Sequence, residues 1–123
     1  MNKFQKQIAK FAKDRNWGQY HNPKDLLLGI VEEIGEMRNL IKWEQDPEVI
    51  QALLLKKKAD VNDGVGDIYW FLALIANQTG VDIDEAISKV ISANEKRFPL
   101  KKTKNRHTNI HLGGHDGNSK LNK

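Results

Sequence analysis

Hydrophobic positions along the first hundred residues recur at helical spacing. Phe4, Ile8 and Phe11 stand three or four residues apart, which places them on one face of a helix that we expect to stop between Asn16 and Gly18. No stretch shows the apolar and polar alternation of a strand between turn signals, and no internal repeat is evident. The pattern therefore predicts an all-α fold.

A second, longer helix is predicted by a cap and an apolar stripe. Asn22 followed by Pro23 is typical of a helix start, because the amide can cap the first turn and proline lacks an N–H that would be unpaired there. The stripe that follows predicts a helix ending near Trp43, with the members Leu27, Ile30, Val31, Ile34, Met37 and Ile41.

Further start and stop signals divide the remaining residues. Asp46 and Pro47 precede a short helix or turn over residues 48–57. The next helix is expected over residues 60–79, and Gly80 suits the left-handed position after its end. A last helix opens with Asp82 and Glu85, spaced like a capping box, and closes at Pro99. The prediction is a bundle of four to five helices.

The apolar run from Ile68 to Ala76 has few polar interruptions on any side. A helix of this kind must be covered on several faces, which is more than a small monomeric bundle provides, so we expect a homo-oligomer. The run is too short to span a bilayer, and no membrane association is expected.

Charge and composition separate a helical domain from a tail. The chain has 123 residues, enough for one domain, and a formal net charge of +4. Residues 100–123 hold six lysines and arginines against Asp116 alone, a charge of +5, which leaves −1 on residues 1–99. The tail has few large apolar residues, so we expect residues 1–99 to form the domain and residues 100–123 to be mostly irregular.

The chain contains no cysteine. Disulfides, thiolate zinc sites and cysteine nucleophiles are therefore excluded, and a reducing compartment is favoured. The N-terminus lacks the apolar run of a secretory signal. These features predict a cytoplasmic protein.

Two of the predicted helices carry carboxylates at one-turn spacing: Glu32, Glu33 and Glu36 in the first, and Asp60, Asp63 and Asp67 in the second. Side chains three or four residues apart share a helix face, so two such helices can direct four oxygen donors at one cation. All-oxygen donors favour Mg²⁺, with Mn²⁺ as a substitute, and the Glu-x-x-His motif of di-iron bundles is absent. The alternative is that both clusters are ordinary solvated helix faces.

Glu33 and Asp67 stand at the border of the predicted apolar faces. Unpaired anions in such places repel one another, and a divalent cation relieves the repulsion. A Mg²⁺ held by carboxylates usually takes a phosphate as a further ligand. Lys89 and Arg97 in the last helix can supply counter-charge, although a basic helix end also has an ordinary dipole role.

The residues resemble a known family. Glu32-Glu33-Ile34-Gly35-Glu36 fits the Glu-Glu-x-x-Glu signature of the MazG-like all-α nucleoside triphosphate pyrophosphohydrolases. Further segments resemble the dCTP pyrophosphatase branch of that family in the same order along the chain: residues 11–23, 26–28 and 41–43, the Asp67 helix, and residues 94–99. The resemblance covers about residues 4 to 99.

The resemblance implies a Mg²⁺ site. The second and third glutamates of the signature, Glu33 and Glu36, would bind the metal with a Glu-x-x-Asp pair from the next long helix. Asp67 matches the aspartate of that pair, but Gly64 stands where the family has the glutamate. We hypothesise that Asp63, next to Gly64, takes over as the fourth ligand.

The resemblance also implies an activity, which is hydrolysis of a nucleoside triphosphate between the α and β phosphates. The substrate would be dCTP or an analogue, and the role would be removal of unwanted nucleotides from the pool. Glu32 or Glu33 would deprotonate the attacking water. The remaining implied contacts are phosphate contacts from Lys89, Asn94 and Arg97, and base contacts from Trp17, His21, Trp43 and Phe71.

The family implies homodimers or homotetramers. Two other functions stay open, the first being a catalytically weak nucleotide-binding regulator of the same fold, motivated by Gly64. The second is a small helical nucleic-acid-binding protein that uses the basic tail, although most of the chain carries almost no net positive charge.

Overall fold

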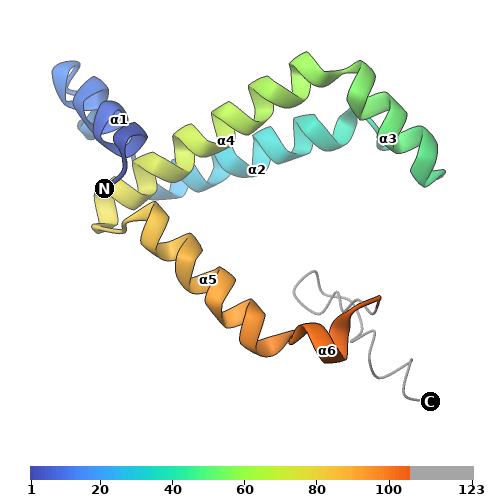
Figure 1. The fold of residues 1–123 in the computed structure, drawn as a ribbon. Coiled ribbons are helices and arrows are strands. Elements are labelled where there is room, and N and C mark those ends of the chain that lie inside the picture. The colour runs from blue at the N-terminus through green and yellow to red at the C-terminus, as the bar shows by residue number, and fades with distance from the viewer. Residues whose placement is uncertain (106–123) are drawn as a thin grey trace. The chain divides into compact units, whose positions relative to one another are not determined.

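A computed structural model describes residues 1–105, which contain six α-helices, one short 3₁₀-helix and no strand (Figure 1). The predicted all-α class is confirmed. The chain divides into two compact units, Met1–Asp84 and a second unit that begins at Glu85, and each is described by itself. The expected division into a domain of residues 1–99 and a tail of residues 100–123 stays a prediction.

The first unit holds α1 (Lys3–Asp14), η1 (Trp17–Gln19), α2 (Pro23–Asn39), α3 (Pro47–Lys56) and α4 (Lys58–Thr79). The predicted start signals act as caps. The Asn22 side chain accepts a hydrogen bond from the Lys24 N–H at 2.8 Å, and Asp46 accepts one from the Glu48 N–H at 2.9 Å. Gly80 ends α4 with φ +70°, the left-handed conformation that glycine adopts readily.

The structure differs from the sequence-based prediction in one helix end and in one additional short helix. α2 ends at Asn39 instead of near Trp43, because the N–H groups of Leu40 and Ile41 bond to carbonyls only three residues back. This tighter spacing makes a turn out of the segment that we expected to be the last turn of the helix. η1 was not predicted, and the segment given as a short helix or turn is the helix α3.

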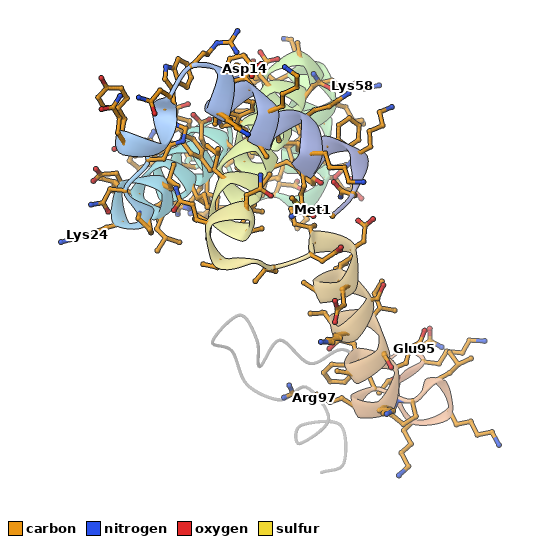
Figure 2. The ribbon with its side chains drawn as sticks, turned by 90° about the vertical axis from the view of Figure 1, so that its left-hand side faces the viewer. Met1, Asp14, Lys24, Lys58, Glu95 and Arg97 are labelled. Atoms are coloured by element: carbon orange, nitrogen blue, oxygen red, sulfur yellow. The ribbon has the colours of Figure 1, made fainter. Side chains whose placement is uncertain are left out.

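The core of the first unit lies where α1, α2 and α4 meet. α2 and α4 run side by side in opposite directions (Figure 1), and Met1 and Asp14 mark the two ends of the α1 region in Figure 2. The buried cluster consists of Ile8, Leu26, Ala73 and Leu74. Half-buried aromatic side chains of α4 pack against it, namely Tyr69, Trp70 and Phe71.

One face of α2 has no partner within the first unit. Leu27, Val31 and Ile34 were predicted to face the core, yet they are 55%, 64% and 52% exposed. α2 packs on α4 with its other side, through Leu26 and Met37. An apolar helix face left in water is typical of a surface that binds another molecule.

The remaining described helices are α5 (Ile83–Arg97), which begins in the last residues of the first unit, and α6 (Leu100–Thr103). Glu95 and Arg97 mark the end of α5 in Figure 2. α6 forms the start of the tail that we expected to be mostly irregular, and the rest of that prediction lies outside the described residues. Within residues 1–105 no helix combines the length and the apolar character needed to cross a membrane.

Candidate functional site

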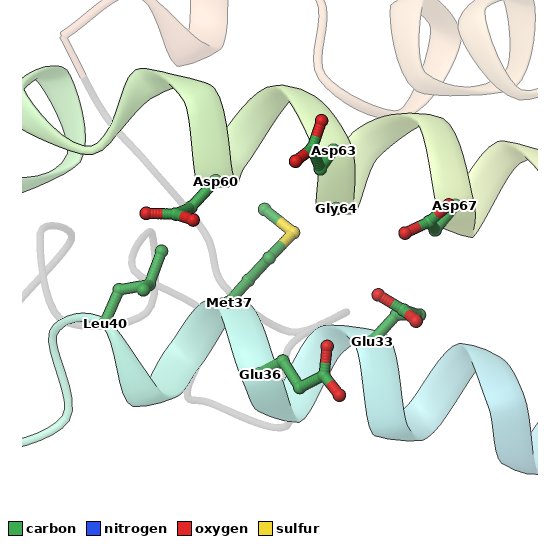
Figure 3. A pocket seen from close by; sticks show the side chains of 8 residues that line it. All are labelled: Glu33, Glu36, Met37, Leu40, Asp60, Asp63, Gly64 and Asp67. Carbon is green, nitrogen blue, oxygen red and sulfur yellow. The ribbon is translucent and has the colours of Figure 1, made fainter.

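The antiparallel contact between α2 and α4 brings the two acidic segments together. The carboxylates of Glu33 and Asp67 point toward each other across it (Figure 3). One turn away, the ring of Phe71 lies over Gly29, where a Cβ atom would come within 2.8 Å of the ring. Glycine at this position therefore allows the two helices to approach closely beside the carboxylate pair.

A similar contact flanks the pair on its other side. Met37 of α2 packs on Gly64 of α4, where a Cβ atom would lie 2.6 Å from the methionine sulfur. Each step of one turn forward along α2 is thus matched by a step of one turn backward along α4. This register places Glu33 and Asp67 opposite each other.

A pocket of 310 Å³ opens at this contact. Five of its eight lining residues are acidic, and the complete set is Glu33, Glu36, Met37, Leu40, Asp60, Asp63, Gly64 and Asp67. No basic residue lines it. The pocket therefore has a strongly negative potential and suits a cation.

Glu33 is the carboxylate most affected by this arrangement. Its pKa is raised above the usual 4.5, first because partial burial disfavours the charged form. The neighbouring charges of Glu36, Asp67 and Glu32 raise the pKa of Glu33 further. Proximity of like charges without a cation is the condition that a bound metal ion would relieve.

The donor set fits a hard divalent cation, because every polar side chain in the pocket offers carboxylate oxygens. In the conformation of this structure, the side chains line the pocket but do not form a complete ligand shell. Within the part of the chain that the structure describes, no three acidic or histidine side chains converge closely enough to hold a metal ion. Glu36, Asp63 and Asp67 are exposed, so their rotamers are free to change when a cation binds.

The predicted metal residues differ in their orientation. Glu36 lines the pocket beside Glu33, one turn along α2. Asp63 also lines the pocket, but Figure 3 shows its carboxylate pointing away from α2, in contrast to that of Asp67. Glu32 is exposed and does not line the pocket, and its charge contributes to the raised pKa of Glu33.

Two of the predicted base-binding residues belong to an aromatic cluster before α2. The Trp17 ring makes edge-to-face contacts with the rings of Phe11 and His21. The distances between ring centroids are 5.4 Å and 6.0 Å, respectively. His21 also lines a second pocket of 310 Å³, between α1, η1 and α4. Its lining carries the cationic Lys13 and no carboxylate, so it differs in charge from the acidic pocket.

The other two predicted base-binding residues lie elsewhere. Trp43 is 86% exposed after the end of α2, whereas Trp17 precedes its start. The ends of this 17-residue helix are about 25 Å apart. One chain by itself therefore does not place both indoles around one base, and Phe71 is packed in the α2–α4 contact.

The predicted phosphate-binding residues Lys89, Asn94 and Arg97 all lie on α5 in the second unit. The Lys89 ammonium pairs with Glu85 at 2.9 Å, and both side chains are largely exposed. The hydrogen bond to Glu85 is also the main cause of the raised pKa of Lys89. Arg97 lies with its guanidinium 5.2 Å from the Phe98 ring.

Besides Gly64, three residues that line the pocket were not among the predicted metal ligands, namely Asp60, Met37 and Leu40. Asp60 stands one turn before Asp63 on α4, and its one-turn spacing was visible in the sequence. Met37 and Leu40 of α2 carried no such signal, because an apolar residue at helical spacing is equally compatible with a core position. Only the register between the two helices shows that they line the pocket.

Comparison with known proteins supports a family assignment. The sequence profile of the MazG-like family matches residues 30–111. dCTP pyrophosphatase 1 of Mus musculus is 34% identical over 93 residues, which are 75% of this chain and 55% of that protein. The Homo sapiens protein of the same name is 33% identical over 92 residues, 74% of this chain and 54% of that protein. The chain thus spans about half the length of these mammalian relatives.

A solved structure shares the fold. The crystal structure of a pyrophosphatase from Archaeoglobus fulgidus superimposes with a TM-score of 0.70, covering 76% of this chain and 87% of that one. Because the sequence identity is 23%, this similarity concerns the fold alone.

Proposed function

Because this chain belongs to the MazG-like family, we propose that it is a Mg²⁺-dependent nucleoside triphosphate pyrophosphohydrolase. It would cleave a deoxynucleoside triphosphate, with dCTP or an analogue as the preferred substrate, into the monophosphate and pyrophosphate. The main observation in support of this proposal is that Glu33 and Asp67 face each other in a pocket lined by five carboxylates. The names of the mammalian relatives support the choice of substrate.

The acidic residues at the site would have two functions, metal binding and activation of the attacking water. Glu33, Glu36 and Asp67 would hold the metal ion, with Asp63 as a fourth ligand after a rotamer change. Bound Mg²⁺, or Mn²⁺ in its place, would draw off charge from the phosphoryl oxygens. Glu32 or Glu33 would accept the proton of the attacking water.

Substrate contacts outside the pocket follow from the family resemblance. Lys89, Asn94 and Arg97 of α5 would hold phosphate oxygens, with Lys89 first leaving its ion pair with Glu85. Trp17, His21, Trp43 and Phe71 would enclose the base. Trp17 and Trp43 lie at opposite ends of α2, so contact of both with one base would require a second copy of the chain.

The exposed face of α2 supports such a second copy. Leu27, Val31 and Ile34 are more than half exposed, although all three are large and apolar. Covering them in a homodimer or homotetramer would remove this surface from water. The absence of cysteine agrees with a cytoplasmic enzyme that removes unwanted nucleotides from the pool.

A second candidate is a nucleotide-binding regulator with little turnover. It is favoured by Gly64, which lines the pocket without a side chain and so contributes no carboxylate there. This candidate would bind a triphosphate with Mg²⁺ and release product slowly or not at all.

A product screen separates the candidates. The chain is incubated with Mg²⁺ and each common nucleoside triphosphate, and pyrophosphate and orthophosphate are measured separately. We expect release of pyrophosphate and monophosphate in equal amounts, with dCTP or an analogue turned over fastest. Orthophosphate as the main product contradicts the proposal, and binding without turnover favours the regulator.

A variant of a proposed metal ligand tests the site directly. Glu36→Gln keeps the size of the side chain and removes a charged ligand, so turnover should fall to background while the fold and oligomer persist. Glu48→Gln is the matched control, since Glu48 is exposed on α3 outside the pocket. Near-normal turnover in Glu36→Gln would remove Glu36 from the site.

A further inference from the structure

The contact between Met37 and Gly64 lies inside the carboxylate pocket and is unusually close. Gly64 is buried, although its neighbours Asp63 and Val65 are exposed. A Cβ atom at position 64 would lie 2.6 Å from both Cγ and Sδ of Met37. Met37 therefore occupies the space that any side chain at position 64 would need.

The contact between Met37 and Gly64 lies next to the acidic pair of Glu33 and Asp67. Figure 3 shows Met37 reaching from α2 to α4 between Asp60 on one side and Glu33 with Asp67 on the other. The contact of Phe71 with Gly29 lies one turn beyond the pair in the opposite direction. Glu33 and Asp67 are thus bracketed by two contacts in which a large side chain fills the space above a glycine.

Other glycines of the same helices lack this feature. A Cβ atom at Gly35 on α2 or at Gly66 on α4 would meet no atom within 4 Å. Glycine disfavours a helix interior, so a glycine that no contact requires is replaceable by alanine. At Gly64, in contrast, alanine would push Met37 out of its position.

Two carboxylates that face each other repel, so some other interaction must hold their helices together at that point. The packing of Met37 on Gly64 supplies such an interaction directly beside them. We propose that Met37 is a positioning residue for the divalent cation, because its packing on Gly64 sets the separation of α2 and α4 at which Glu33 and Asp67 reach one ion. This inference rests on the proposed metal site, and Met37 itself does not touch the ion.

The inference is tested by Mn²⁺ binding to the metal-free full-length chain, followed by electron paramagnetic resonance. Met37→Ala leaves the space at Gly64 empty and should weaken Mn²⁺ binding about tenfold, the size of effect seen when a group that supports a ligand is lost. Met37→Leu keeps the volume and should retain most of the affinity. Thermal unfolding of each metal-free variant is measured in parallel, so that a loss of binding is compared with the change in stability.

A second variant reaches the same contact from the other helix and does not depend on the folding of Met37→Ala. Gly64→Ala should weaken Mn²⁺ binding because it displaces Met37, whereas the matched control Gly66→Ala should leave binding unchanged. Combining Gly64→Ala with Met37→Ala removes the clash and partly refills the gap. The double variant should therefore bind Mn²⁺ more tightly than either single variant.

The outcomes separate this inference from the proposed function. If the wild-type chain binds Mn²⁺ and both Met37→Ala and Gly64→Ala bind it with the same affinity, the positioning role is wrong and the metal site is unaffected. A wild-type chain that binds no Mn²⁺ overturns the metal site and the positioning role together. Mn²⁺ binding with the expected variant pattern, but without pyrophosphate release, supports the positioning role and contradicts only the proposed activity.

Discussion

At the scale of single residues, the electrostatic state of Glu33 has the clearest consequence. Its carboxyl is partly buried and lies near Glu36 and Asp67, and these causes raise its pKa above 4.5. The folded chain therefore binds a proton at Glu33 more readily than the unfolded chain does. Linkage then requires that this group favours folding at low pH and that the contribution is lost as the pH rises through the raised pKa.

The first prediction follows from this pH dependence of stability. In the presence of a chelator, Glu33→Gln should melt at a higher temperature than wild type at pH 7, because the variant removes the repelled charge. The difference should shrink as the pH falls toward 4.5, where Glu33 is increasingly protonated in the wild type. Thermal unfolding over this pH range measures it.

Added Mg²⁺ reverses the comparison. It should raise the melting temperature of wild type more than that of Glu33→Gln, because the variant lacks one ligand. If Glu33→Gln melts at or below the wild-type temperature at pH 7 without metal, repulsion at this group does not limit stability.

At the scale of elements, a buried side chain joins α1 to the end of α4. Gln5 is 0% exposed, and its Nε2 donates to the Val81 carbonyl at 2.9 Å and to the Asn77 Oδ1 at 3.3 Å. Its Oε1 accepts from the Ile83 N–H at 2.9 Å, and Asn77 donates back to the Gln5 carbonyl at 3.1 Å. These bonds hold the turn that leads from α4 into the first residue of α5.

We predict that Gln5→Ala destabilises the fold by about 3 kcal/mol, because it removes three hydrogen bonds of a fully buried side chain, each worth about 1 kcal/mol. Gln7→Ala is the matched control, since Gln7 is exposed on the same helix and should change stability by no more than about 0.5 kcal/mol. Urea unfolding at one fixed protein concentration gives both values. Equal stability of the two variants would show that the hydrogen bonds of Gln5 do not hold the turn.

At the scale of the whole molecule, the exposed apolar face of α2 is the surface through which the proposed oligomer would form. Leu27, Val31 and Ile34 are more than half exposed and do not line the acidic pocket between α2 and α4. A contact through this face would leave the acidic pocket of each chain in place. It would also allow aromatic residues of different chains to approach one another.

The corresponding prediction concerns association. Val31→Glu should weaken the oligomer at least about tenfold, because a charge buried in an apolar contact loses its hydration without gaining a partner. Lys6→Glu, at an exposed position of α1, should leave association unchanged. Sedimentation at several concentrations measures both, and a monomeric wild-type chain would contradict the proposed oligomer.

The sequence by itself was sufficient for the local features of this protein. The caps at Asn22 and Asp46 and the stop at Gly80 place helix ends correctly, because each depends on hydrogen bonds or a backbone angle within a few residues. The spacing of Glu33 and Glu36 likewise follows from helix geometry alone. The end of α2 was misplaced because an apolar residue at position 41 continues the helical pattern without forming a helix.

Tertiary structure decided which of these features meet. The pairing of Glu33 with Asp67, and of Met37 with Gly64, depends on the register of two helices that lie about thirty residues apart in the chain. That register is set by close approach at glycines, and no spacing rule within one helix contains it. The outward face of Leu27, Val31 and Ile34 has the same origin: helical periodicity shows that these side chains share a face, but only packing determines which face another element covers.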